Sequence, residues 1–176
     1  MTDQRSNRAC VVCHCHMNVN TKVHGLAEYA GAQPALITKL VFDGCGIIQL
    51  PCPEATHLGM SRWSMTREQY DTPAYRRHCC ALLGPVVDTL VALSKDGCRL
   101  EAVYGVDGSP SCGVNETSAG FEGGLIGRGG PDAELPESHR VSGRGVYMEE
   151  FAALLAEAGL DIPFTTPPSA QPLAQS

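Results

Sequence analysis

Three short apolar runs that carry β-branched residues, at positions 9–13, 46–50 and 100–106, decide the fold class of this chain. Each is short and apolar enough to predict a strand that is buried on both faces. Amphipathic patterns at 35–42 and 73–94 lie between them. Strands that alternate with helices predict an α/β fold, here a compact, single-domain, Rossmann-like sandwich on a mostly parallel sheet.

Helices are also expected at residues 23–30, 66–70 and 146–158. Pro85 interrupts the pattern at 73–94. It is expected to kink or split that helix, because proline has no amide hydrogen and collides with the preceding turn.

One domain is expected at residues 8–161. A flexible N-terminus at 1–7 precedes it, and a proline-rich C-terminal extension at 162–176 follows it. Nine glycines lie between residues 105 and 130, which predicts a long loop of the kind that often carries function. Whether this loop covers a site is left open.

The charge of the chain restricts its partners. There are 13 Lys and Arg against 19 Asp and Glu, so the formal net charge is −6. A large nucleic acid is therefore not expected as a partner. No stretch reaches the roughly 18 apolar residues of a membrane span, and the polar start shows no secretory signal. We expect a cytoplasmic protein with no membrane partner, of open oligomeric state.

The cysteine content is high, with nine cysteines in 176 residues. An odd number does not close a disulfide framework, and in a reducing compartment clustered cysteines more often bind metals or act in catalysis. Four of them are expected to be small buried apolar residues: Cys45, Cys79, Cys80 and Cys98.

Three other cysteines, Cys15, Cys52 and Cys112, each follow one of the predicted strands. Because ligands bind outside the carboxyl ends of parallel strands, we expect these three thiols to meet at one point. Pro53 suits the first position of a helix, which would leave free amide groups beside the Cys52 thiolate.

The first turn offers a competing pattern, in which Cys10, Cys13 and Cys15 lie close to His14 and His16. This pattern is compatible with a non-catalytic zinc or redox module built on the three cysteines and one histidine. The opposing interpretation is that Cys10 and Cys13 only pack inside the apolar strand. The roles of both histidines stay open.

Two motifs, Cys52-Pro53-Glu54 and Ser109-Pro110-Ser111-Cys112-Gly113, resemble those of the bacterial 2-thiouracil desulfidase family. The resemblance runs from about residue 8 to 160 and includes Gly145-Val146 and Gly159-Leu160 of the closing helix. The first turn departs from that family, which commonly has Cys-Leu-Leu-Gly where this chain has Cys15-His16-Met17-Asn18. The chain therefore resembles a divergent branch.

The resemblance implies a Rossmann-like desulfidase domain with a [4Fe–4S] cluster held by Cys15, Cys52 and Cys112. The fourth iron would be left open. Glu54 corresponds to the acid/base glutamate of the family and Ser109 to its active-site serine. The implied enzyme is a hydrolase of sulfur metabolism that removes sulfur from a small thiocarbonyl compound, such as a thiolated pyrimidine. It would release hydrosulfide without exchanging electrons, and the actual substrate stays open.

A related hypothesis keeps the cluster but assigns it to sulfur transfer or desulfuration on thiolated nucleotides of RNA. Its support is a group of basic residues, Arg62, Arg67, Arg76 and Arg77. The opposing interpretation is a solvated helix face.

Overall fold

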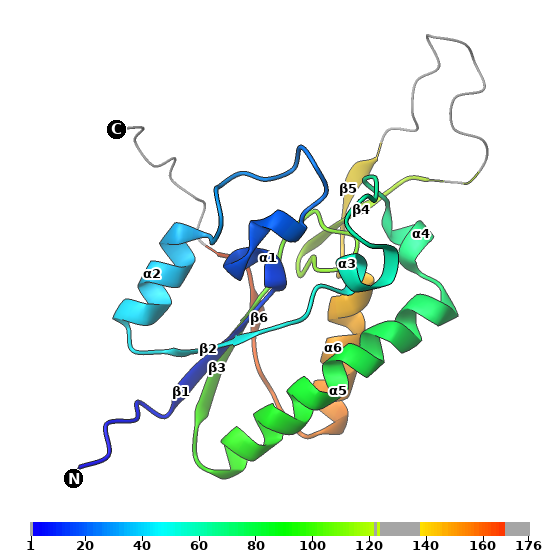
Figure 1. Cartoon of the computed structure of the whole chain (residues 1–176). Helices are drawn as coiled ribbons and strands as arrows, with labels where there is room; N and C mark the ends of the chain where they lie inside the picture. Colours follow the sequence, from blue (N-terminus) through cyan, green and yellow to red (C-terminus); the bar gives the residue numbers. More distant parts are fainter. Residues whose placement is uncertain (1, 122, 124–137, 168–176) are drawn as a thin grey trace, which may run out of the picture.

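The computed structural model describes residues 2–121, 123 and 138–167. Its main sheet has four strands in the order β2-β1-β3-β6, and all neighbours are parallel. The strands are β1 (Arg8–Val12), β2 (Gly46–Gln49), β3 (Arg99–Tyr104) and β6 (Phe164–Thr165). The expected α/β fold on a mostly parallel sheet is confirmed (Figure 1).

Helices cover both faces of this sheet (Figure 1). The long ones are α2 (Pro34–Phe42), α5 (Pro73–Lys95) and α6 (Val146–Glu157). On one face, α2 packs Leu36 and Leu40 against Cys10 and Val12 of β1. On the other, α5 and α6 enclose a larger core that includes Val11. Alternate residues of β1 therefore serve two cores, which is why the whole strand is apolar.

Short elements gather beyond the carboxyl ends of the strands (Figure 1). They are α1 (His14–Met17), the 3-10 helix η1 (Val19–Thr21), α3 (Pro53–Leu58), α4 (Arg67–Tyr70), β4 (Glu116–Ala119) and β5 (His139–Ser142). The strands β4 and β5 pair antiparallel in a sheet of their own. These elements build the surroundings of the strand ends, where ligands of parallel sheets bind.

Four expectations differ from the structure. Residues 23–30 form no helix, because Gly25 adopts a φ of +88°, which a right-handed helix cannot accommodate. The helix α5 is not split at Pro85 but continues through it to Lys95. The glycine-rich segment contains β4, and most of its remainder from residue 122 lies outside the described residues. The strand β6 lies beyond residue 161, so the domain extends further than expected.

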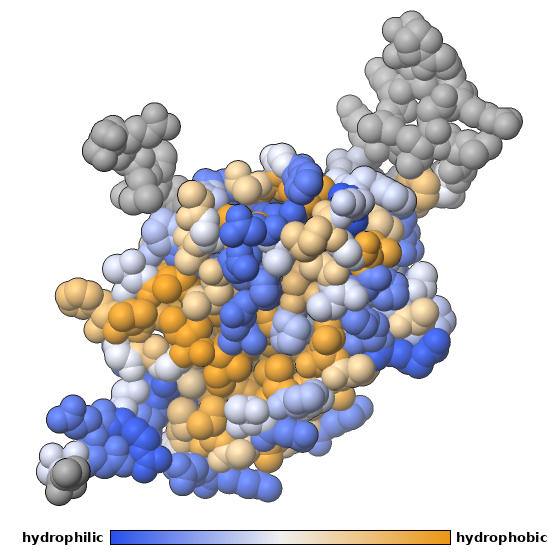
Figure 2. Space-filling model, in the orientation of Figure 1, coloured by the Kyte–Doolittle hydropathy of each residue, from blue (hydrophilic) through white to orange (hydrophobic). Residues whose placement is uncertain are grey.

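The helix α5 is long and apolar enough to span a membrane by length and composition alone. One side of that helix nevertheless lies in the core, through Tyr75, Cys79, Leu83, Val87 and Leu90. Apolar residues also gather on the surface in the region of α2, the edge strand β2 and α5 (Figure 2). Val41 and Phe42 at the end of α2 are exposed.

Gly113 is a sensitive point of this architecture. A Cβ atom there would lie 2.1 Å from the carbonyl oxygen of Glu116 and 2.9 Å from that of Ser109. We expect Gly113→Ala to lower the free energy of unfolding by about 3 kcal/mol or more, because backbone on two sides must move. Urea denaturation of both proteins measures this difference.

Gly84 in α5 is the matched control, since a Cβ there meets no atom within 4 Å. Gly84→Ala should change stability by less than about 1 kcal/mol, because better helix propensity and crowding by the following Pro85 oppose each other. Equal losses for the two variants would contradict the tight turn at Gly113.

Candidate metal centre

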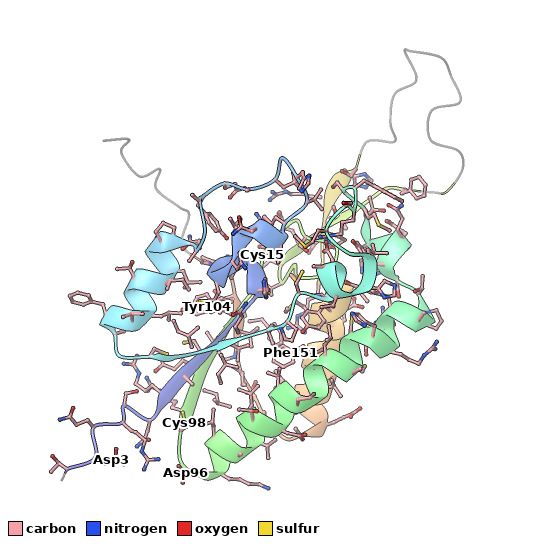
Figure 3. The ribbon with its side chains drawn as sticks, in the orientation of Figure 1. Asp3, Cys15, Asp96, Cys98, Tyr104 and Phe151 are labelled. Atoms are coloured by element: carbon pink, nitrogen blue, oxygen red, sulfur yellow. The ribbon has the colours of Figure 1, made fainter. Side chains whose placement is uncertain are left out.

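Cys15 lies in α1, directly beyond the carboxyl end of β1, where Figure 3 labels it. Its Sγ is 3.9 Å from the Thr21 hydroxyl. The hydroxyl of Tyr29 donates to the Cys15 carbonyl oxygen at 2.9 Å. Both contacts come from the segment after α1, which folds back over the strand end.

Cys52 is the N-cap of α3, with Pro53 at the first helical position as the sequence indicated. The amide of Ala55 donates to the Cys52 Sγ at 3.4 Å. Burial raises the pKa of the Cys52 thiol, and this hydrogen bond acts in the opposite direction. The helix start therefore stabilises negative charge on sulfur in a site that otherwise disfavours it.

Cys112 lies in a turn after β3 that Ser109 organises. The Ser109 Oγ accepts hydrogen bonds from the amides of Cys112 at 2.9 Å and Ser111 at 3.3 Å. Gly145, the N-cap of α6, packs so closely on this turn that a Cβ would lie 2.5 Å from the Ser111 carbonyl carbon. Ser109 thus fixes the loop that presents the third cysteine.

All five residues predicted from the sequence line one cleft of about 440 Å³, a volume typical of small-molecule sites. They are Cys15, Cys52, Cys112, Glu54 and Ser109. The structure therefore brings together groups from three separate strand ends. Charged side chains of both signs complete the lining: Lys22, Glu28, Arg62, Asp107 and Arg140.

The thiols of this cleft influence one another. Burial raises the pKa of Cys15 to about 12, and the nearby sulfurs of Cys52 and Cys13 add to the shift. The pKa of Cys112 lies well above its ordinary value because of the neighbouring Cys13 thiol, burial and the negative charge of Glu54. The metal-free thiols are therefore protonated at neutral pH. Because thiolates are the ligand form, metal binding must release protons.

Glu54 forms an ion pair with Arg62, whose Nε lies 3.2 Å from the Glu54 Oε2. The two side chains are only 12% and 3% exposed, so the pair is buried. Arg62 also donates to the Thr21 carbonyl oxygen at 2.6 Å. The arginine fixes the orientation of the carboxylate and ties α3 to the segment after α1.

The four arginines considered as a basic group have different surroundings. Arg62 is buried against Glu54. Arg67 and Arg76 are bound by carboxylates of Asp71, Glu149 and Glu150. Arg77 is exposed. These arginines therefore do not form a free basic patch.

Cys13 packs in the core, as one interpretation of the sequence expected, and its thiol also neighbours a residue of the cleft. It is the N-cap of α1, is 1% exposed and neighbours Cys112. Cys10 packs with the α2 core, whereas Cys13 packs with the α5 and α6 core. Because they lie on opposite faces of the sheet, the zinc module predicted from Cys10, Cys13 and Cys15 is not assembled.

Four buried side-chain atoms have no hydrogen-bond partner among the described residues: His14 Nε2, His16 Nδ1, Tyr70 OH and Tyr147 OH. The histidines flank Cys15 in the sequence, the Tyr70 hydroxyl is close to Glu54 and Arg62, and the Tyr147 hydroxyl is close to the sulfurs of Cys112 and Cys13. Native proteins rarely leave such groups unpaired. The two tyrosine hydroxyls can donate, so they fit a group with hydrogen-bond acceptors, such as the sulfides of an iron–sulfur cluster. The His16 Nδ1 differs, because its Nε2 donates to the Gly105 carbonyl oxygen at 2.9 Å and leaves Nδ1 as an acceptor.

The spacing of the sulfurs also bears on the kind of metal. A single tetrahedral zinc holds thiolates about 3.8 Å apart through bonds of about 2.3 Å. Among the described residues, one group of three or more possible ligands has all its atoms within 4.8 Å, and it is Cys10, Cys45 and Glu101. Cys15, Cys52 and Cys112 do not form such a compact group among the described residues.

The remaining cysteines follow the expectation only in part. Cys45 and Cys79 are buried, as expected. Cys80 and Cys98 are only partly buried, and the Cys80 thiol lies 3.1 Å from a Glu150 carboxylate oxygen.

Comparison with known proteins gives one relative that decides the family. "Uncharacterized protein MJ0003" of Methanocaldococcus jannaschii is 36% identical over 110 residues, which cover 62% of this chain and 70% of the relative. The chain belongs to the family of MJ0003. No protein-family model and no solved structure matches it. The name of this relative states no activity, so function is inferred from the residues of the cleft.

The unpaired hydroxyl of Tyr147 yields a prediction for iron-free protein. Tyr147→Phe should leave stability unchanged or raise it by up to about 1 kcal/mol, because it removes a buried polar group without a partner. Tyr75→Phe is the matched control, since the Tyr75 hydroxyl bonds the Ser111 Oγ at 2.8 Å. That variant should lose about 1–2 kcal/mol. Thermal denaturation compares the two, and equal losses would mean that Tyr147 has a partner within the chain.

Proposed function

We propose that this chain is an iron–sulfur-dependent desulfidase that hydrolyses the C=S bond of a small thiocarbonyl compound. The observation that carries the proposal is the single cleft lined by Cys15, Cys52 and Cys112 together with Glu54 and Ser109. Three thiols, a carboxylate and a hydroxyl are the groups that the resemblance to 2-thiouracil desulfidases requires. These residues are far apart in the sequence and come together only in the folded chain.

In this proposal Cys15, Cys52 and Cys112 hold a [4Fe–4S] cluster. When bound, a cluster with three protein ligands supplies an iron with an open position, a Lewis acid for the soft sulfur of a thiocarbonyl group. Hydrogen bonds within the chain position two of these cysteines. The Ala55 amide supports Cys52, and the Ser109 turn holds the amide of Cys112.

Glu54 is the proposed general base. It lies in the first turn of α3, two residues after Cys52, and both line the cleft. The carboxylate would take a proton from water while the water oxygen bonds to the thiocarbonyl carbon. Arg62 keeps the carboxylate in one orientation. The carbon keeps oxygen, the sulfur leaves as hydrosulfide, and no electron is exchanged.

Ser109 is the proposed substrate-orienting hydroxyl. Its oxygen already accepts two amide hydrogen bonds, which leaves its own proton available for an acceptor in the cleft. A cleft of about 440 Å³ with charged groups of both signs suits a polar heterocycle such as a thiolated pyrimidine. Free thiols and an iron cluster would be maintained in a reducing, cytoplasmic setting.

A second candidate is a non-catalytic metal centre with four thiolate ligands. The observation that favours it is the proximity of Cys13 to Cys112 and Cys15. If Cys13 were a fourth ligand, no iron would have an open position. The two candidates therefore differ in the outcome of a single substitution, Cys13→Ser.

The cluster is tested by purification without oxygen. The unaltered protein should be brown, with about four irons and four sulfides per chain. Cys15→Ser, Cys52→Ser and Cys112→Ser should each lose most of the iron. Cys98→Ser, at a partly buried cysteine outside the cleft, should not. Loss of iron in Cys13→Ser as well would favour the four-thiolate centre, and a colourless protein would end the proposal.

Glu54 is tested by sulfide release from thiouracil and other thiocarbonyl compounds. Glu54→Gln should lower kcat by about 10²–10⁴-fold, because general-base catalysis is lost while iron content is retained. Glu28 is the matched control, an exposed carboxylate on the same cleft. Glu28→Gln should keep kcat within a factor of a few, and an equal loss in both variants would argue against Glu54 as the base.

A further inference from the structure

A second group of sulfur and oxygen ligands lies on the other face of the sheet. Cys45 directly precedes β2, Cys10 lies in β1, and Glu101 lies in β3. Because the strand order is β2-β1-β3, the three residues form a row across neighbouring strands. The two Sγ atoms are 3.1 Å apart, and one ligand atom from each residue lies within 4.8 Å of the others.

Glu101 is adjacent to Cys10 across the pairing of β1 with β3. Ala9 is opposite Leu100, so the next residue of each strand brings Cys10 beside Glu101. A β-bulge follows, because Val11 is opposite Val103 and two residues of β3 therefore face the single residue Cys10. Bulges are frequent next to functional sites.

The Glu101 carboxylate is held in place by two arginines. Arg8 donates to both of its oxygens, with Nε at 2.5 Å from Oε1 and Nη2 at 3.0 Å from Oε2. Arg99 donates to Oε1 through Nε, at 3.1 Å, and through Nη2. The Oε2 atom accepts only the Arg8 Nη2 bond, so it has a lone pair left for a metal. Hydrogen-bonded carboxylates of this kind are usual as metal ligands.

Both arginines also balance charge. Two thiolates and a carboxylate carry three negative charges, against two from a divalent cation. Arg8 and Arg99 supply positive charge on the outer side of Glu101. The Glu101 side chain is 20% exposed, which gives an ion a route to two otherwise buried sulfurs.

We propose that Cys10, Cys45 and Glu101 form a zinc site, separate from the cleft. Sulfur, sulfur and oxygen ligands with a water as the fourth suit Zn²⁺. Binding would exchange the two thiol protons for one Zn²⁺, so zinc affinity should rise with pH. The sulfurs need to separate by only about 0.7 Å to reach the spacing of about 3.8 Å that zinc requires. The ion would connect three strands.

The site is tested first in a full-length chain that cannot hold the cluster, Cys15→Ser/Cys52→Ser/Cys112→Ser. After removal of metals, Zn²⁺ is titrated against a chromophoric chelator, and one Zn²⁺ per chain is expected. Adding Cys45→Ser should abolish this binding, and adding Glu101→Gln should weaken it at least tenfold. Adding Cys98→Ser, at a cysteine outside the group, should leave it unchanged.

Co²⁺ binding provides a measurement that needs no substitution within the proposed zinc site. In the same chain, one Co²⁺ should give the thiolate charge-transfer and tetrahedral d–d bands of a two-sulfur site. The proposal is overturned if no Zn²⁺ binds, if binding survives Cys45→Ser, or if alkylation and mass measurement find a Cys10–Cys45 disulfide instead. None of these outcomes depends on the desulfidase proposal, which is tested by iron content.

Discussion

Parallel pairing of β1 with both β2 and β3 is the interaction on which the rest of the structure depends. Three parallel strands end at the same edge, so three chain segments that are remote in sequence leave the sheet within a short distance of one another. Each segment begins with a turn that contains a cysteine. A β1 that paired antiparallel with either neighbour would send one of these cysteines to the opposite end of the sheet.

The cleft combines burial with a high density of groups that prefer to be charged. The pKa values of all three thiols are raised, by burial at Cys15 and Cys52 and by the Cys13 thiol together with burial at Cys112. The start of α3 offsets only part of the shift at Cys52. Unpaired hydroxyls of Tyr70 and Tyr147 add further cost. A metal group that takes up thiolates and accepts hydrogen bonds relieves both costs at once, which is the physical case for a bound cluster.

The parts of the site that depend on strand ends were predictable from the sequence. The meeting of Cys15, Cys52 and Cys112, each after an apolar run, needed only the rule for parallel sheets. Glu54 and Ser109 came from the resemblance to the 2-thiouracil desulfidase family. Other parts depended on long-range geometry that no local pattern contains. The burial of Arg62 requires the return of the chain after α3, and the proximity of Cys13 to Cys112 requires knowledge of which face of β1 meets the turn after β3. The row of Cys10, Cys45 and Glu101 requires the strand order and register, which a sequence pattern does not reveal.

The alternation of β1 has a consequence for how this chain can vary. Cys10 and Val12 belong to one face, and Val11 and Cys13 to the other. Insertion or deletion of a single residue within the strand would exchange the two sets, moving each sulfur into the opposite core. The loop after α1, in contrast, is exposed from His24 to Glu28, and it therefore tolerates length changes more easily. The lining of the cleft can therefore diverge through that loop while the strand keeps its length.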